Sequence, residues 1–186
     1  MENKKSKFWA EVWDFVKTII ITVICALLFT KFVASPVEVD GSSMYPTLVD
    51  GQRAFSGILT RKINGIKRFQ IVTAYLEARD ELIVKRVIGL PGETLEIRDD
   101  VLYINGEPVE QAFLNEDYMR QDMQAYGRDY FTADFGPVTL GEDEYFIMGD
   151  NRPHSADARV FGPFKESDIK TTGLFVFWPF SDFGNK

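Results

Sequence analysis

The sequence predicts a mainly β protein, in which an N-terminal transmembrane helix precedes an antiparallel β-sheet domain that carries a small cap insertion. Three observations support this fold class. Residues 15–34 are almost entirely apolar, and most of the chain after them alternates apolar and polar residues between turn signals. Residues 115–135 are polar and mixed and interrupt that pattern. A chain of 186 residues suffices for one globular domain and an appendage.

The apolar segment 15–34 predicts an uncleaved membrane anchor, with lysines near both of its ends. A cleaved signal peptide is the main alternative, but a cut after Ala34 would leave bulky Phe32 where a small residue is required. A buried core helix is the other alternative. Lysines at or before position 17 favour a cytoplasmic N-terminus, so we expect residues 1–14 in the cytoplasm and residues 35–186 outside the cell membrane.

Strand signals follow in order along residues 35–186. Alternating or β-branched runs cover 37–39, 69–75, 81–88, 94–97, 101–104, 107–109, 138–140, 144–148 and 173–178. Leu90-Pro-Gly92 has the residues of a type II turn, and Asn105-Gly106 is a hairpin signal. We expect the cap insertion at approximately residues 105–137, within the extracytoplasmic domain.

Composition excludes several function classes. The net charge of −7 argues against nucleic-acid binding, which needs clustered Lys and Arg. One His and one Cys, Cys25 within the apolar segment, cannot build a usual zinc site, so neither a metal nor another cofactor is expected. The sequence does not indicate an oligomeric state.

A serine nucleophile needs a base, and two residues qualify. His154 is the one histidine, although a histidine beside Pro153 in a polar loop is more often solvated. Lys85 lies inside an apolar run and shares a strand face with Ile83 and Val87, where desolvation would lower its pKa. It could instead be a charge that protects an edge strand from aggregation. Arg86, on the opposite face, is expected in solvent or in a salt bridge.

The segments SSMYPT, VKRVIGLPGE and GDNRPHSADAR, in this order after one anchor, resemble the signature boxes of type I signal peptidases, also called leader peptidases (peptidase family S26). These are membrane-bound serine endopeptidases that remove N-terminal signal peptides from exported preproteins with a Ser/Lys dyad. The single anchor is most similar to Gram-positive members. The resemblance implies a barrel-like antiparallel domain of the signal peptidase I (LexA-like) type, with signal peptides and membrane lipid as partners.

The resemblance also implies a role for each matching residue. Ser43, rather than Ser42, matches the nucleophile, Lys85 the general base, and Ser155 the serine that orients the lysine. Four further residues match structural positions near the site: Asp150, Arg152, Asp157 and Arg159. Six apolar residues are expected by position to line the pockets for small substrate side chains: Val37, Val39, Met44, Leu48, Ile83 and Val84. Their other expected role is core packing.

The chain departs from the family pattern at a few positions. Gly41 stands where some members carry a hydroxyl that assists the oxyanion hole, which puts that geometry in question. Gln52, Gln70 and Ala158 are milder departures. Two other functions therefore stay open: a LexA-like self-cleaving repressor, which would need a DNA-binding domain in place of the anchor, and an inactive membrane-tethered binding protein.

Overall fold

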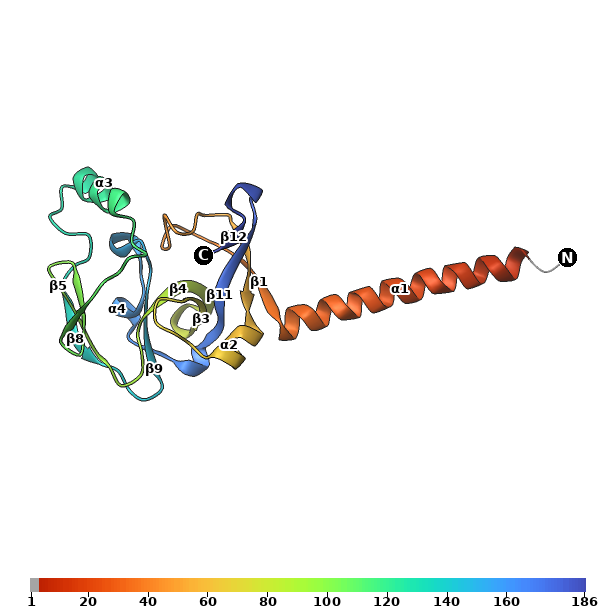
Figure 1. The fold of residues 1–186 in the computed structure, drawn as a ribbon, viewed down its shortest axis with the longest axis horizontal. Coiled ribbons are helices and arrows are strands. Elements are labelled where there is room, and N and C mark those ends of the chain that lie inside the picture. The colour runs from red at the N-terminus through yellow and green to blue at the C-terminus, as the bar shows by residue number, and fades with distance from the viewer. Residues whose placement is uncertain (1–3) are drawn as a thin grey trace.

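The computed structural model describes residues 4–186 and has an N-terminal helix attached to a β domain (Figure 1). The helices are α1 (Lys4–Phe32), α2 (Ile58–Asn64), α3 (Glu116–Tyr126) and α4 (Ala158–Phe161). The strands are β1 (Ala34–Glu38), β2 (Arg53–Gly57), β3 (Ile71–Leu76), β4 (Glu81–Gly89), β5 (Thr94–Arg98), β6 (Val101–Ile104), β7 (Glu107–Val109), β8 (Phe135–Thr139), β9 (Glu144–Met148), β10 (Phe164–Lys165), β11 (Ile169–Trp178) and β12 (Gly184–Asn185). This arrangement confirms the predicted mainly β fold class.

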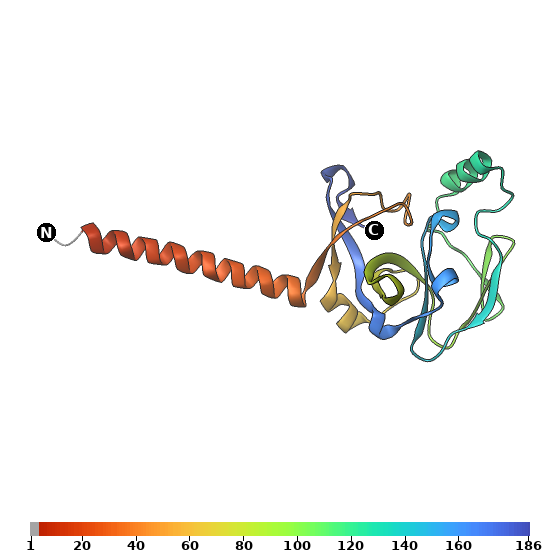
Figure 2. The same cartoon turned by 180° about the vertical axis from the view of Figure 1, so that it is seen from behind.

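Helix α1 is one continuous helix that extends away from the β domain, as both views of the ribbon show (Figures 1 and 2). Its residues Lys7–Phe32 are long and apolar enough to cross a membrane. The helix begins well before the predicted anchor at residue 15, because the preceding sequence contains no Gly or Pro that would stop it.

The strands form two antiparallel sheets. The larger sheet has the order β1-β2-β11-β3-β4-β9-β10, with β12 beside β11, and the smaller has the order β7-β6-β5-β8. Among the described residues the larger sheet stays open, with β1 and β10 at its edges, so the expected barrel-like closure is not formed. Every strand pair is antiparallel, as predicted.

Both turns that the sequence predicts are present in the structure. Glu93 N donates to Leu90 O at 3.2 Å, and Gly92 has a φ of 76°, as the third position of a type II turn requires. Asn105 and Gly106 both have positive φ and join β6 to β7. Several elements were not predicted, among them β2, the short helix α2 that follows it, α4, β10 and β12.

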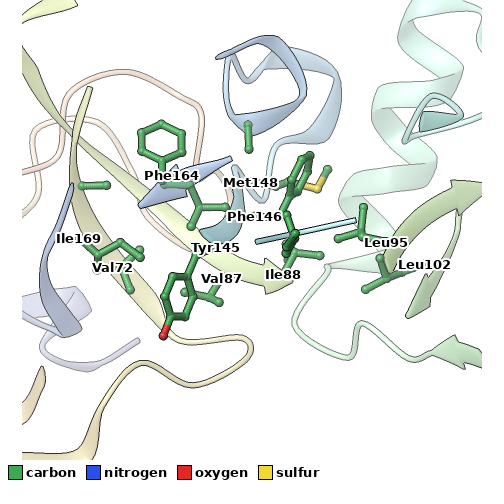
Figure 3. Packing of buried hydrophobic residues seen from close by; sticks show 14 of the residues in the cluster. Val72, Val87, Ile88, Leu95, Leu102, Tyr145, Phe146, Met148, Phe164 and Ile169 are labelled. Carbon is green, nitrogen blue, oxygen red and sulfur yellow. The ribbon is translucent and has the colours of Figure 1, made fainter. Parts of the chain in front are cut away.

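The main core lies between the two sheets. Figure 3 shows Leu95 of the smaller sheet packed near Ile88 and Phe146 of the larger one, all three fully buried. A second buried cluster under the 39–50 segment contains Val39, Met44 and Leu48. These two cores fix the segments that meet at the site, since close packing leaves the backbone little freedom to shift.

Segment 105–137, the predicted cap, contains β7, α3 and the start of β8. Helix α3 lies at the end of the molecule opposite α1 in both ribbon views. Asn115 caps this helix, since its side chain accepts a hydrogen bond from Tyr118 N at 2.8 Å.

Candidate active site

Ser43 and Lys85 meet at the junction of the turn after β1 and the centre of β4. Lys85 Nζ lies 2.8 Å from Ser43 Oγ and donates to it, and it also donates to Val84 O at 3.0 Å. The β3–β4 register places Lys85 opposite Val72, deep in the sheet. Only 4% of Lys85 is exposed. The structure therefore brings together the two residues that the sequence singles out.

Burial changes the proton affinity of this lysine. Desolvation lowers the pKa of Lys85 to about 8, although Asp157, Glu81 and Asp150 act in the opposite direction. An amine with this pKa is partly neutral near pH 7, which an exposed lysine is not. At 2.8 Å its lone pair can take the hydroxyl proton of Ser43.

A groove of about 400 Å³ opens above the Ser43–Lys85 pair. Four of the six predicted substrate-binding residues line it: Val39, Met44, Ile83 and Val84. Val37 and Leu48 do not line this groove, and Leu48 is fully buried in the second core cluster. The rim carries charged side chains, Glu38, Asp40, Arg79 and Glu81 among them.

The loop 149–159 forms the wall beside the pair. Arg159 binds Asp157 through Nη2 at 2.8 Å, and Asp157 also accepts from Gly149 N at 3.0 Å. Burial acts to raise the pKa of Asp157, but the bonds to Arg159 and Gly149 outweigh it and the pKa lies below its usual value. Arg152 is 1% exposed and donates to Gly149 O and to Gln111 Oε1, and burial lowers its pKa to about 10.

Asp150 connects this loop to β4 and to the turn after Ser43. Its carboxylate accepts from Arg86 Nε at 2.8 Å and Nη2 at 2.7 Å, and from Thr47 Oγ1 at 2.6 Å. Arg86 is therefore in a buried salt bridge, one of the two positions that the sequence allowed for it. Because Arg86 follows Lys85 on one strand, this ion pair fixes the strand from the face opposite the dyad.

Ser155 lies close to the serine turn, but within residues 4–186 its side chain makes no hydrogen bond to Ser43 or Lys85. Its Oγ is buried and finds no hydrogen-bond partner within residues 4–186. A Cβ on Gly149 would lie 2.3 Å from both Ser155 Oγ and Ser43 O, so glycine is required for this close approach. The lysine-orienting role of Ser155 stays a prediction.

The backbone around Ser43 offers a donor for a developing oxyanion. Ser43 N has no acceptor among the described residues, whereas Gly41 N donates to Asp50 Oδ1 at 2.7 Å. Gly41 has a φ of +80° and supplies no side-chain donor. The free N–H of Ser43 therefore points to a one-donor oxyanion hole.

Comparison with known proteins decides the family. Residues 12–178 match the family described as "Signal peptidase, peptidase S26". The chain belongs to this family. A signal peptidase I of Bacillus amyloliquefaciens is 42% identical over 182 residues, which cover 97% of this chain and 96% of that protein. Signal peptidase I S of Bacillus subtilis (strain 168) is 42% identical over 184 residues, with the same two coverages.

A more distant relative and a solved structure carry the same name. Signal peptidase IB of Staphylococcus aureus (strain COL) is 33% identical over 180 residues, covering 93% of each chain. A crystal structure of a signal peptidase I from Enterococcus faecalis V583 is 35% identical and has a TM-score of 0.48, covering 57% of this chain and 94% of that chain. The family match and the Bacillus relatives confirm the resemblance found in the sequence motifs, and this member of the signal peptidase family is a peptidase.

In this signal peptidase family member, His154 contacts the cap rather than Ser43. His154 Nε2 lies 2.8 Å from Asp122 Oδ2 of α3, although the residue also lines the groove. Sequence reasoning missed Asn151, whose side chain donates to Ser42 O in the serine turn, and Tyr118, whose hydroxyl donates to Asn151 Oδ1. Asn151 lies within the GDN motif and could have been found there, whereas nothing in the sequence indicates the position of Tyr118.

Proposed function

We propose that this chain is a membrane-anchored serine endopeptidase that removes N-terminal signal peptides from exported preproteins, with Ser43 as nucleophile and Lys85 as general base. The observation that carries the proposal is the 2.8 Å contact between Ser43 Oγ and the amine of a buried lysine, at the base of an open groove. Membership of the signal peptidase family supports the substrate class.

The reaction follows from the positions of these groups. Neutral Lys85 takes the proton of Ser43 Oγ as that oxygen attacks the scissile carbonyl, and the N–H of Ser43 binds the resulting oxyanion. When the C–N bond breaks, protonated Lys85 gives its proton to the leaving amine. Water then attacks the acyl-enzyme with Lys85 again as base, which releases the new carboxyl end and restores Ser43. General-base catalysis of this kind contributes about 10²–10⁴ in rate.

The substrate lies extended along β4 in this proposal. Strand β4 pairs with β9 only from Arg86 onward, so among the described strands the edge of residues 81–85 that faces away from β3 is unpaired. A peptide can add to this edge by backbone hydrogen bonds. Val39, Met44, Ile83 and Val84 then form the shallow apolar walls that select small side chains, while Leu48 packs in the same core cluster as Val39 and Met44.

We further propose that α1 anchors the domain with its N-terminus in the cytoplasm and the catalytic domain outside. The helix exposes its apolar side chains along its length, and lysines precede or open the span. The exposed Trp178 and Phe180 would contact lipid headgroups. Because the apolar segment of a signal peptide lies in the same bilayer, anchoring raises its effective concentration at the groove.

Cleavage of a preprotein in detergent micelles tests this proposal. Ser43→Ala and Lys85→Ala are expected to reduce cleavage to the uncatalysed background, because each removes a reacting group. Ser42→Ala and His154→Ala serve as neighbouring controls and are expected to keep activity within about tenfold of wild type. A Ser43→Ala enzyme that still cleaves would disprove the assignment, as would a wild-type protein that binds the preprotein without cleaving it.

A further inference from the structure

Asn151 lies between the serine turn and the cap helix and makes hydrogen bonds to both. Asn151 N donates to Ser43 O at 3.0 Å, and Asn151 Nδ2 donates to Ser42 O at 3.0 Å. On its other side, Asn151 Oδ1 accepts from Tyr118 Oη at 3.0 Å. Asn151 is 2% exposed, so water does not readily replace these partners.

The chemistry of these groups fixes the orientation of the amide. Ser42 O can only accept, so Nδ2 must face it, and Oδ1 must therefore face α3. Tyr118 Oη is the donor that Oδ1 requires. Burial is the main reason that the pKa of Tyr118 is raised, which keeps its hydroxyl protonated as a donor. Without that hydroxyl a buried carbonyl oxygen would lose its partner and the amide would be free to turn.

The cap helix holds Tyr118 in a defined place. The side chain of Asn115 accepts from Tyr118 N, and the Tyr118 ring packs edge-on against Tyr45 at 4.9 Å between centroids and against Phe131 at 6.0 Å. Tyr45 is two residues beyond Ser43, so α3 contacts the serine turn both through this ring and through Asn151.

A second link joins α3 to the same loop. Asp122, which is almost fully buried in α3, pairs with His154 at 2.8 Å and with Arg128 at 3.2 Å. His154 directly precedes Ser155. Helix α3 is therefore attached to the loop 149–159 at Asn151 and at His154, and the first of these attachments continues to the backbone of Ser43.

We propose that Tyr118 is a positioning residue for the nucleophile. Through Asn151 it holds the backbone of Ser42 and Ser43, and with it the Ser43 N–H that receives the oxyanion. This inference rests on the proposed function of Ser43. Because Gly41 contributes no side-chain donor, the oxyanion depends on how firmly that single N–H is placed. A misplacement of about 1 Å can cost about 10²-fold in rate.

The test compares kcat and KM of the full-length enzyme in detergent micelles with a fluorogenic signal-peptide substrate. Tyr118→Phe keeps the ring contacts and removes the hydroxyl, and we expect kcat to fall about tenfold while KM stays within about twofold. Tyr130→Phe is the matched control and should leave both kcat and KM unchanged. It removes a hydroxyl from the same cap segment, and that hydroxyl has no hydrogen-bond partner among residues 4–186.

A double-mutant cycle isolates the path through Asn151. In an Asn151→Ala background Tyr118→Phe should have no further effect on kcat, since the amide through which it acts is gone. The pH midpoint of the rate should be the same in Tyr118→Phe as in wild type, because Lys85 keeps its surroundings. A merely structural role would lower the melting temperature and leave kcat of the folded enzyme intact.

Several outcomes would overturn the inference. They are an unchanged kcat in Tyr118→Phe, a change confined to KM, an equal loss in Tyr130→Phe, or additive effects of the two substitutions in the cycle. None of these outcomes would contradict the proposed peptidase function. That proposal fails separately, through activity in Ser43→Ala.

Discussion

At the scale of single residues, the burial that suits Lys85 to its proposed role as general base also lowers the stability of the fold. The folded protein encloses an amine that the unfolded chain would leave in water, and desolvation of its charged form is what lowers its pKa to about 8. Because the folded protein destabilises the charged form of Lys85, the neutral amine that a general base requires becomes available. The pKa of an unfolded lysine is about 10.4.

Replacing Lys85 by Met should stabilise the fold while it abolishes activity. Below pH 8 the folded wild-type protein must either bury the charged amine or release its proton, and both cost free energy of folding. Met has no charge to bury, so we expect a higher melting temperature for Lys85→Met at pH 6.5. Between pH 8 and about 10.4 the unfolded chain binds more protons than the folded one, so wild-type stability rises with pH and the advantage of Met shrinks. Thermal unfolding in micelles measures this. A difference in melting temperature between Lys85→Met and wild type that increases with pH would contradict the lowered pKa of Lys85.

At the scale of elements, β4 uses its two faces for two tasks. Lys85 points to Ser43, and Arg86, the next residue, points to the carboxylate of Asp150. The Asp150 carboxylate also accepts from Thr47, which lies on the serine turn. One strand therefore carries the proposed base and also fixes the loop and the turn around it.

Arg86→Ala should unfold or strongly destabilise the domain. It leaves Asp150 buried without its cation, a loss of roughly 3–5 kcal/mol for a pair of this burial. Arg98→Ala provides the control, since the Arg98–Glu96 pair at 3.5 Å is on the surface and its loss should change the stability far less. Urea unfolding of both variants measures the difference. Equal effects would mean that the buried pair contributes no more than a surface pair.

Much at the element scale could be predicted from the sequence. Strands β4, β5, β6 and β9 were predicted because their residues alternate or are β-branched between turn signals. The strand predicted from residue 69 begins at Ile71, because Phe69 has a φ of 65°, which no strand residue adopts. Strand β2 was missed because its pattern, Arg53-Ala-Phe-Ser-Gly57, is short and ends in glycine.

The candidate site was predicted unevenly, for a physical reason. Lys85 could be picked out because a lysine on an apolar strand face is unusual. Tyr118 could not, because a tyrosine in a polar segment shows nothing of the buried amide that it contacts across 33 positions. Tertiary contacts of this kind leave no periodic pattern in the sequence.

At the scale of the whole molecule, the candidate membrane span and the cap helix lie at opposite ends (Figures 1 and 2). Helix α1 leaves the domain at β1, whereas the cap helix α3 lies at the opposite end (Figures 1 and 2). The candidate membrane span is not buried against the domain, so α1 contributes little to the packing of the active site.

Removal of residues 1–33 should therefore separate catalysis from membrane targeting. A short soluble peptide should be cleaved with nearly unchanged kcat, since the groove and the dyad lie within 38–156. Cleavage of a preprotein in lipid vesicles should fall by about 10²-fold or more, because the effective concentration that the shared bilayer provides is lost. Equal cleavage of vesicle-bound preprotein by both forms would contradict the proposed anchor role.

The central claim is that a neutral Lys85 is the base that activates Ser43, and the pH dependence of kcat/KM tests it most directly. With an uncharged peptide substrate the rate should fall about tenfold per pH unit below an apparent pKa of about 8 and level off above it. His154→Ala should show the same fall in kcat/KM at low pH. A fall in rate at acidic pH that disappears in His154→Ala would instead identify the histidine as the base and contradict the account.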